Sequence, residues 1–197
     1  MKNPNHPKKG SDIKVNPIRE IKDIESIKKL LSNNTRDLLL FTMGINNGLR
    51  MGDLLSLRVG MVRYLKPCET IKIKEQKTRK ENVLMINKTT HKILKKYLDE
   101  NELTDEDYLF QSRKGNNRPL TVGSVNRMVK DWCSSIHLKG NYGTHTLRKS
   151  FSYIQRMKYG VSWEVLTKRL NHSSPSVTMR YLGIEDKEVN GILMNEI

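Results

Sequence analysis

The sequence is poor in cysteine and has no long apolar run. Its two cysteines, Cys68 and Cys133, are too few for a disulfide framework. The longest apolar run, around Leu38–Phe41, falls far short of the ~18 residues that a transmembrane helix needs. No apolar segment follows the basic N-terminus as it would in a signal peptide. These absences argue against a secreted disulfide scaffold and a membrane span, so we expect a cytoplasmic protein.

Several common enzyme signatures are also missing. The chain has no GxxxxGK phosphate loop, no HExxH, no CxxC and no GxSxG. Three of its histidines, His6, His91 and His137, have no metal-ligand spacing around them. We therefore expect no metal site and no cofactor. Any chemistry must depend on arginine, lysine, histidine and hydroxyl groups.

Positive charge is abundant and uneven. The chain has 36 Lys+Arg against 21 Asp+Glu, which gives a net charge of +15 on 197 residues. Basic residues gather in segments 63–80 and 139–180, and acidic residues in segments 99–107 and 184–197. No amphipathic segment combines a basic face with a Trp/Phe-rich face, which disfavours a membrane surface. Nucleic acid is the partner that this charge favours.

Hydrophobic periodicity predicts a mostly helical α+β domain with one small antiparallel sheet. Alternation at 71–73 and 83–86 predicts a hairpin or a three-stranded meander with residues 76–80 at its tip. Residues 1–16 are expected to be a flexible basic arm, and 184–197 a weakly amphipathic tail, which leaves 17–183 as the folded domain. Helices are predicted from residue 23 and over 36–45 (N-capped by Thr35), 51–57, 89–99, 121–136, 145–158, 162–170 and 174–182.

Polar side chains that could bind and cleave a phosphodiester occur at several places along the chain. His145 and Arg148 lie three residues apart, on one face of a predicted helix. Tyr181 follows His172 by nine residues. Arg50 precedes Asp53 by three, and Lys77 occupies the predicted hairpin tip. Taken singly, each of these residues could have a purely structural role. Tyrosines and histidines often pack in cores or cap helices, and an arginine at a helix end can offset the helix dipole.

Four segments carry a resemblance to a known family. They are GLRMGDLLSLR (48–58), EQKTRKENVLMI (75–86), HTLRKSF (145–151) and LNHSSPSVTMRYLG (170–183). In this order and at this spacing they resemble the tyrosine recombinase/phage integrase family, over roughly residues 17–183. The resemblance implies the tyrosine recombinase catalytic fold, with a hairpin packed on a helical bundle. It also implies a site-specific DNA recombinase or integrase, encoded by a bacterium or a phage on a mobile element.

The resemblance implies a role for each polar group. Tyr181 would attack the scissile phosphate and form a 3′-phosphotyrosyl link, and two nearby guanidinium groups would lower its pKa. Lys77 would protonate the leaving 5′-oxygen. The remaining implied roles are phosphate clamping by Arg50 and Arg148, hydrogen bonding and proton transfer by His145 and His172, and orientation of Arg50 by Asp53. The residues expected to contact DNA are Lys74, Arg79, Lys80, Arg113, Lys114, Arg127 and Lys149.

This sequence departs from the family pattern at several positions. Asn171 replaces the usual glycine before the second histidine, and we expect the turn to survive because asparagine tolerates the left-handed conformation. Asp53 stands where glutamate is common, which shortens its reach toward Arg50 by one methylene. Lys149 stands where an aromatic residue or histidine is often seen. The return strand of the hairpin also lacks the usual proline.

The resemblance leaves alternatives open. It implies duplex DNA with specific recombination sites as the partner, a monomer that forms a homo-tetramer on DNA, and accessory bending or directionality factors. It suggests a tail that docks on a neighbouring protomer. The short N-terminus fits a catalytic-domain-only member, like the fimbrial-switch invertases, or a fragment of a longer integrase. Two further functions compete: a type IB topoisomerase-like relaxing enzyme and a non-catalytic DNA-binding regulator.

Overall fold

The computed structural model describes residues 15–113, 117–183, 190–191 and 193–196. Residues 1–14 of the expected arm, Lys114, and residues 184–189, 192 and 197 of the tail lie outside the described residues. Asn16, at the end of the expected arm, is not free, because its backbone N–H donates to the carbonyl of Asn141 at 2.7 Å. The folded part of the chain therefore includes the last residues assigned to the arm.

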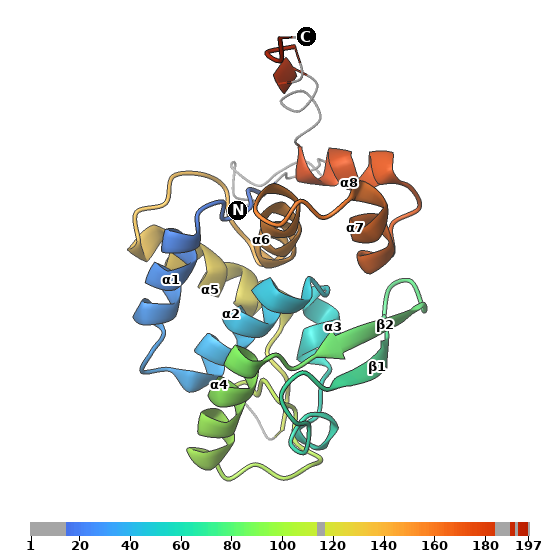
Figure 1. Ribbon diagram of the computed structural model, residues 1–197. Helices are drawn as coiled ribbons and strands as arrows, with labels where there is room; N and C mark the ends of the chain where they lie inside the picture. Colours follow the sequence, from blue (N-terminus) through green and yellow to red (C-terminus); the bar gives the residue numbers. More distant parts are fainter. Residues whose placement is uncertain (1–14, 114–116, 184–189, 192, 197) are drawn as a thin grey trace, which may run out of the picture.

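Over the described residues the architecture is mostly helical, with one two-stranded antiparallel sheet (Figure 1). The mixed α+β prediction is confirmed, and the hairpin alternative is correct where the three-stranded meander is not. In chain order the elements are α1 (Ile21–Leu30), α2 (Thr35–Asn47), α3 (Met51–Leu55), a 3-10 turn (Val59–Met61), β1 (Thr70–Lys74), β2 (Glu81–Met85), α4 (Lys88–Asp99), α5 (Val122–Ser135), α6 (Thr144–Met157), α7 (Trp163–Arg169) and α8 (Pro175–Leu182).

Helix α2 lies at the centre of the main core. Its Leu39, Leu40, Phe41 and Met43 are fully buried, and the helix packs against α4 and α6. At Gly44 an added Cβ would come within 2.6 Å of the Leu147 side chain on α6. Glycine at this position therefore lets the two helices approach closely, which fixes α6 against the core.

Helix ends follow capping chemistry, with one correction. Asn34, rather than Thr35, caps α2 by accepting the N–H of Asp37, while Thr35 donates to Glu100 across the fold. Gly48 closes α2 in the left-handed conformation at φ 59°. Ser162 and Ser174 cap α7 and α8 as the sequence predicts.

The hairpin has one buried and one exposed face. Ile71 pairs with Leu84, and Ile73 pairs with Asn82. Ile73 and Leu84 are buried, which matches the period of two that a half-buried strand requires. The Arg169 Nη1 at the end of α7 donates to the Asn82 side chain at 2.9 Å. The hairpin is thereby linked to the C-terminal helices.

The C-terminal helices have a small core of their own. Trp163, Leu166 and Leu182 form a buried cluster between α7 and α8, separate from the main core. Tyr153 of α6 packs on both clusters. Helix α8 is therefore supported mainly by α7 and attached to the rest of the molecule through α6.

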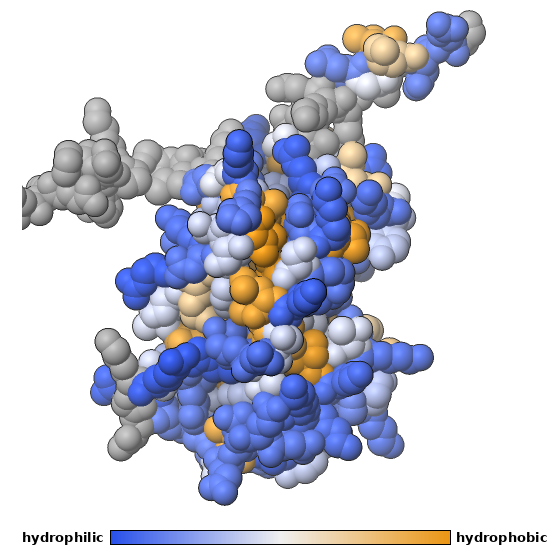
Figure 2. All heavy atoms as spheres, turned by 90° about the vertical axis from the view of Figure 1, so that its left-hand side faces the viewer, coloured by the Kyte–Doolittle hydropathy of each residue, from blue (hydrophilic) through white to orange (hydrophobic). Residues whose placement is uncertain are grey.

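The surface on the α1 side carries a band of apolar side chains among charged ones (Figure 2). A cavity of about 420 Å³ lies between α1 and α6 and is lined in part by Ile21, Ile24 and Phe151. Among the described residues, no helix is both long enough and apolar enough to cross a bilayer.

Candidate active site

A cavity of about 140 Å³ brings together four of the predicted catalytic residues. Arg50 comes from the start of α3, Lys77 from the hairpin turn, and His145 and Arg148 from α6. Leu49, Met51, Gly52, Val122 and Thr144 complete its lining. Three segments that are distant in the sequence therefore present cationic and imidazole groups to one small space.

Arg148 is held rigidly at the floor of this site. Only 3 % of its surface is exposed, and its Nη1 and Nη2 donate to the carbonyls of Gly48 at 2.7 Å and Leu170 at 2.6 Å. Burial lowers its pKa to about 10, so it stays cationic at neutral pH. Because a guanidinium has five N–H donors, these two bonds leave others available to a ligand.

Arg50 is oriented by a residue that the sequence did not single out. Its Nη1 lies 2.5 Å from the Glu75 carboxylate, whose side chain is completely buried. Burial alone would raise the pKa of Glu75, but hydrogen bonds from Thr78 and Asn82 and the Arg50 charge together hold it below its usual value. The clue in the sequence was an acid two residues before Lys77, one of only two acids in the basic segment 63–80.

Asp53 does not orient Arg50 directly, which corrects the sequence prediction. Its Oδ1 accepts the backbone N–H of Gln76 at 2.8 Å, and its Oδ2 is buried without a hydrogen-bond partner among the described residues. Burial raises the pKa of Asp53, and the bond from Gln76 only partly opposes that change. The short aspartate side chain reaches the hairpin backbone, while the longer Glu75 reaches the guanidinium.

Tyr181 on α8 joins this group. Its hydroxyl oxygen lies 3.5 Å from His145 Nδ1, and its ring meets the His172 ring edge-on with centroids 5.2 Å apart. The expectation of a lowered pKa is wrong for the free protein. Burial raises the Tyr181 pKa to about 12, although the charges of Arg148 and Arg50 and a hydrogen bond with Arg148 lower it. The phenol is therefore neutral at rest and needs a base when it reacts.

Both histidines are neutral near pH 7. Desolvation, followed by the charges of Arg148 and Arg50, lowers the pKa of His172 to about 4. Desolvation and the neighbouring Arg148 and Lys149 also lower the pKa of His145. His172 Nδ1 lies 2.9 Å from the Thr178 hydroxyl, which fixes its ring. A neutral imidazole keeps one nitrogen free to accept a proton.

The turn that presents His172 forms as expected. Asn171 adopts φ 51°, and its side-chain amide donates to the Glu81 carbonyl at 3.2 Å. The His172 backbone N–H donates to Thr167 at 3.1 Å. Asparagine thus replaces the usual glycine without loss of the left-handed turn, and it adds a link to the hairpin.

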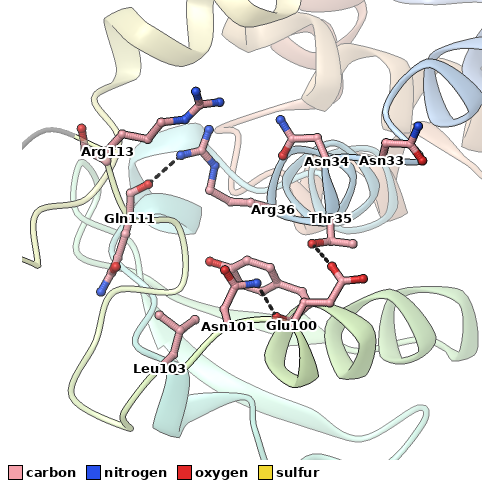
Figure 3. A pocket seen from close by; sticks show the side chains of 11 residues that line it. Asn33, Asn34, Thr35, Arg36, Glu100, Asn101, Leu103, Gln111 and Arg113 are labelled. Atoms are coloured by element: carbon pink, nitrogen blue, oxygen red, sulfur yellow. Dashed lines mark hydrogen bonds between the residues drawn. The ribbon is translucent and has the colours of Figure 1, made fainter.

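The predicted DNA-contact residues fall into different environments. Lys74, Arg79 and Lys80 are exposed on the hairpin, and Arg127 is exposed on α5. Arg113 lines a separate, larger cavity of about 520 Å³ beside Arg36 and Asn34 (Figure 3). None of the predicted catalytic residues lines that cavity.

Lys149 is not on the surface, which corrects its assignment as a DNA contact. Only 8 % of it is exposed, and its Nζ lies 5.0 Å from the centroid of the Tyr181 ring. Following Arg148 on α6, it faces α8 rather than solvent. In the part of the chain that the structure describes, no group of three or more His, Cys, Asp and Glu residues is placed to hold a metal ion.

Comparison with known proteins places the chain in a family. The profile of the Phage integrase family matches residues 18–188. The chain is 35 % identical over 175 residues to the probable integrase/recombinase YoeC of Bacillus subtilis, covering 87 % of this chain and 91 % of that protein. It is 28 % identical to the tyrosine recombinase XerA of Pyrococcus horikoshii, covering 84 % of this chain and 57 % of that protein.

Solved structures agree on the fold. A crystal structure of XerA recombinase superimposes with a TM-score of 0.72 at 21 % identity, covering 92 % of this chain and 67 % of that chain. XerH recombinase bound to its difH substrate gives a TM-score of 0.69 at 22 % identity, covering 90 % of this chain and 52 % of that chain. The chain spans only about half the length of several of these proteins. It belongs to the Phage integrase family and carries the catalytic domain of a tyrosine recombinase, a class of enzyme that breaks and rejoins DNA.

Proposed function

We propose that the chain is a site-specific recombinase that cleaves and rejoins duplex DNA through a 3′-phosphotyrosyl intermediate, without metal or nucleotide hydrolysis. One arrangement supports this proposal above all. The Tyr181 hydroxyl lies 3.5 Å from His145, beside a cavity lined by Arg50, Lys77 and Arg148. A nucleophile, a base and three cations thus meet at a space suited to one phosphate.

In the first step the Tyr181 oxygen attacks the scissile phosphorus. The phenol proton passes to the neutral imidazole of His145, which is within reach and whose lowered pKa leaves it unprotonated. The guanidinium groups of Arg50 and Arg148 bind the non-bridging oxygens and stabilise the charge that develops there. His172 donates a further hydrogen bond to the phosphoryl group.

The bond from phosphorus to the 5′-oxygen breaks as the phosphotyrosyl bond forms. Lys77, in the exposed hairpin turn at the rim of the cavity, donates a proton to the departing 5′-oxygen. Religation reverses these steps with the 5′-hydroxyl of another strand. Because one phosphodiester replaces another, the energy of the broken bond is conserved, and no nucleotide needs to be hydrolysed.

The charge distribution supports binding to the DNA backbone. Lys74, Arg79 and Lys80 surround the hairpin turn that carries Lys77, so they would contact phosphates next to the scissile one. Such contacts release counterions, and affinity should fall steeply as salt increases. A homo-tetramer on paired sites, assisted by DNA-bending or directionality factors, would complete the exchange.

A covalent adduct provides the test. Binding sites selected by the protein from a random duplex library are nicked near the selected position, and the protein is incubated with them in excess chelator. We expect a protein–DNA adduct that persists on a denaturing gel and depends on Tyr181. Strand exchange between two sites then separates recombination from simple relaxation.

Two variants make the test specific. Tyr181→Phe should give no adduct. Tyr159→Phe, which alters a tyrosine that is 70 % exposed between α6 and α7, should give a normal one. An adduct that survives in Tyr181→Phe, or no adduct from the unaltered protein on any selected site, would refute the mechanism and favour a non-catalytic DNA-binding role.

A further inference from the structure

Glu75 is a buried carboxylate at the first position of the hairpin turn. None of its side-chain surface is exposed, and burying a charged group is costly unless it is paired and hydrogen-bonded. Its partners come from the site, the turn and the segments beside them, and they include the Asn171 side chain before His172. Arg50 Nη1 lies 2.5 Å from Oε2, Thr78 Oγ1 donates to Oε2 at 2.5 Å, and Asn82 Nδ2 donates to Oε1 at 2.8 Å.

The backbone of Glu75 closes the turn around Lys77. Its N–H donates to the Lys80 carbonyl at 2.9 Å, and its own carbonyl accepts the Arg79 N–H at 2.9 Å. The next residue, Gln76, donates its N–H to Asp53 on α3. The turn is therefore attached at two points to the start of α3: Glu75 pairs with Arg50, which precedes the helix, and Gln76 donates to Asp53 within it.

These contacts suggest more than a contribution to stability. Replacing a buried ion pair with apolar residues is often neutral or stabilising, so the pair alone is weak evidence for a stabilising role. What the carboxylate does supply is geometry. It binds the side chain of one predicted catalytic residue and the loop of another, and its buried position keeps it away from DNA.

We propose that Glu75 is a positioning residue that holds Arg50 and the Lys77 turn in register, so that the phosphate clamp and the proton donor meet the same phosphodiester. The inference rests on the proposed function. It predicts that loss of the Glu75 charge impairs both phosphate binding by Arg50 and proton donation by Lys77.

The two effects can be separated by the chemistry of the leaving group. A scissile phosphate whose bridging 5′-oxygen is replaced by sulfur releases a thiolate, which leaves without a proton because a thiol is far more acidic than an alcohol. Cleavage of this substrate therefore bypasses Lys77. Lys77→Ala should be slow on the oxygen substrate and close to normal on the sulfur substrate.

Single-turnover cleavage of both substrates tests Glu75→Gln. On the oxygen substrate we expect a loss of about 10- to 100-fold, the scale of a misplacement of about 1 Å. On the sulfur substrate the loss should shrink but not vanish, because Arg50 remains misplaced. On the oxygen substrate, the double variant Glu75→Gln/Lys77→Ala should show a fold loss in cleavage rate smaller than the product of the two single-variant fold losses. Glu81→Gln, an exposed acid on the same hairpin, should behave like the unaltered protein.

Several results would overturn the inference. Normal cleavage by a folded Glu75→Gln protein would exclude a positioning role. An equal loss on both substrates, with independent effects of the two substitutions, would limit Glu75 to Arg50 alone. If Glu75→Gln does not fold, Thr78→Val removes one bond to the carboxylate and should show the same partial recovery on sulfur. Absence of cleavage by the unaltered protein would instead count against the proposed function.

Discussion

The two halves of the active site are supported differently. The phosphate-binding half, with Arg148 on α6 and Arg50 at α3, rests on the main core. Arg148 donates to the Gly48 carbonyl at the end of α2, and it also reaches the Leu170 carbonyl at the end of α7. The nucleophile half, with Tyr181 on α8, rests on a small cluster of Trp163, Leu166 and Leu182. The phosphate receptor is therefore fixed by the main core, whereas the nucleophile is supported by a separate cluster.

The largest effect should come from the fixed half. Arg148→Lys should slow formation of the covalent adduct by about 10²- to 10³-fold, the usual cost of removing a transition-state hydrogen-bond donor. A lysine cannot bridge the Gly48 and Leu170 carbonyls and also bind a phosphate through a planar fork. Single-turnover cleavage at saturating protein measures this loss. A rate within threefold of the unaltered protein would show that the fork is dispensable.

The separation of the two cores can be tested by deletion of buried methyl groups. Leu166→Ala removes part of the small cluster, and Leu147→Ala part of the main core; both side chains are 1 % exposed. Each change should cost about 2–4 kcal/mol locally. We expect Leu166→Ala to speed hydrogen exchange in α7 and α8 while α2 stays protected, and Leu147→Ala to lower protection throughout. Uniform loss in both variants would show one cooperative unit.

Lys149 connects the halves, because it lies on α6 beneath the Tyr181 ring. Lys149→Met keeps most of the length of the side chain but removes the charge that lies 5.0 Å from the centroid of the Tyr181 ring. A cation this close to a phenol favours the phenolate. We expect adduct formation to slow about tenfold, in line with a desolvated cation–π contact. The loss should diminish as pH rises, since a more basic solution compensates for a less acidic phenol. Lys158→Met, at the exposed end of the same helix, should have no effect.

The smallest effect concerns pH and stability. His172 has a pKa of about 4 in the folded protein, against about 6.5 in the unfolded chain. The unfolded state therefore binds the proton more tightly, so this contribution to stability is fully present above pH 6.5 and is lost as pH falls toward 4. Because the ring is half-buried, we expect a loss of about 1 kcal/mol between pH 7.5 and 5. Denaturant unfolding should show a shallower pH dependence in His172→Gln.

Sequence patterns predicted the structure correctly where the interactions involve residues close together in the chain. The caps at Ser162 and Ser174, the left-handed turn at Asn171 and the helical spacing of the core residues all depend on neighbours a few positions away. The Thr35 cap was wrong because Asn34, one residue earlier, competes for the same role and Glu100 binds the threonine hydroxyl. That hydroxyl partner is 65 residues away, beyond the reach of any local pattern.

The sequence alone determined the helical class, the hairpin and the candidate residues, since periodicity, capping and motif order are properties of the chain itself. Tertiary structure decided which carboxylate reaches Arg50, why Lys149 faces Tyr181 and not solvent, and that the Tyr181 pKa rises to about 12 instead of falling. These outcomes depend on burial and on distances between segments far apart in the chain. Desolvation is a property of the packed molecule, and at Tyr181 it outweighs the nearby positive charges that the sequence had placed there.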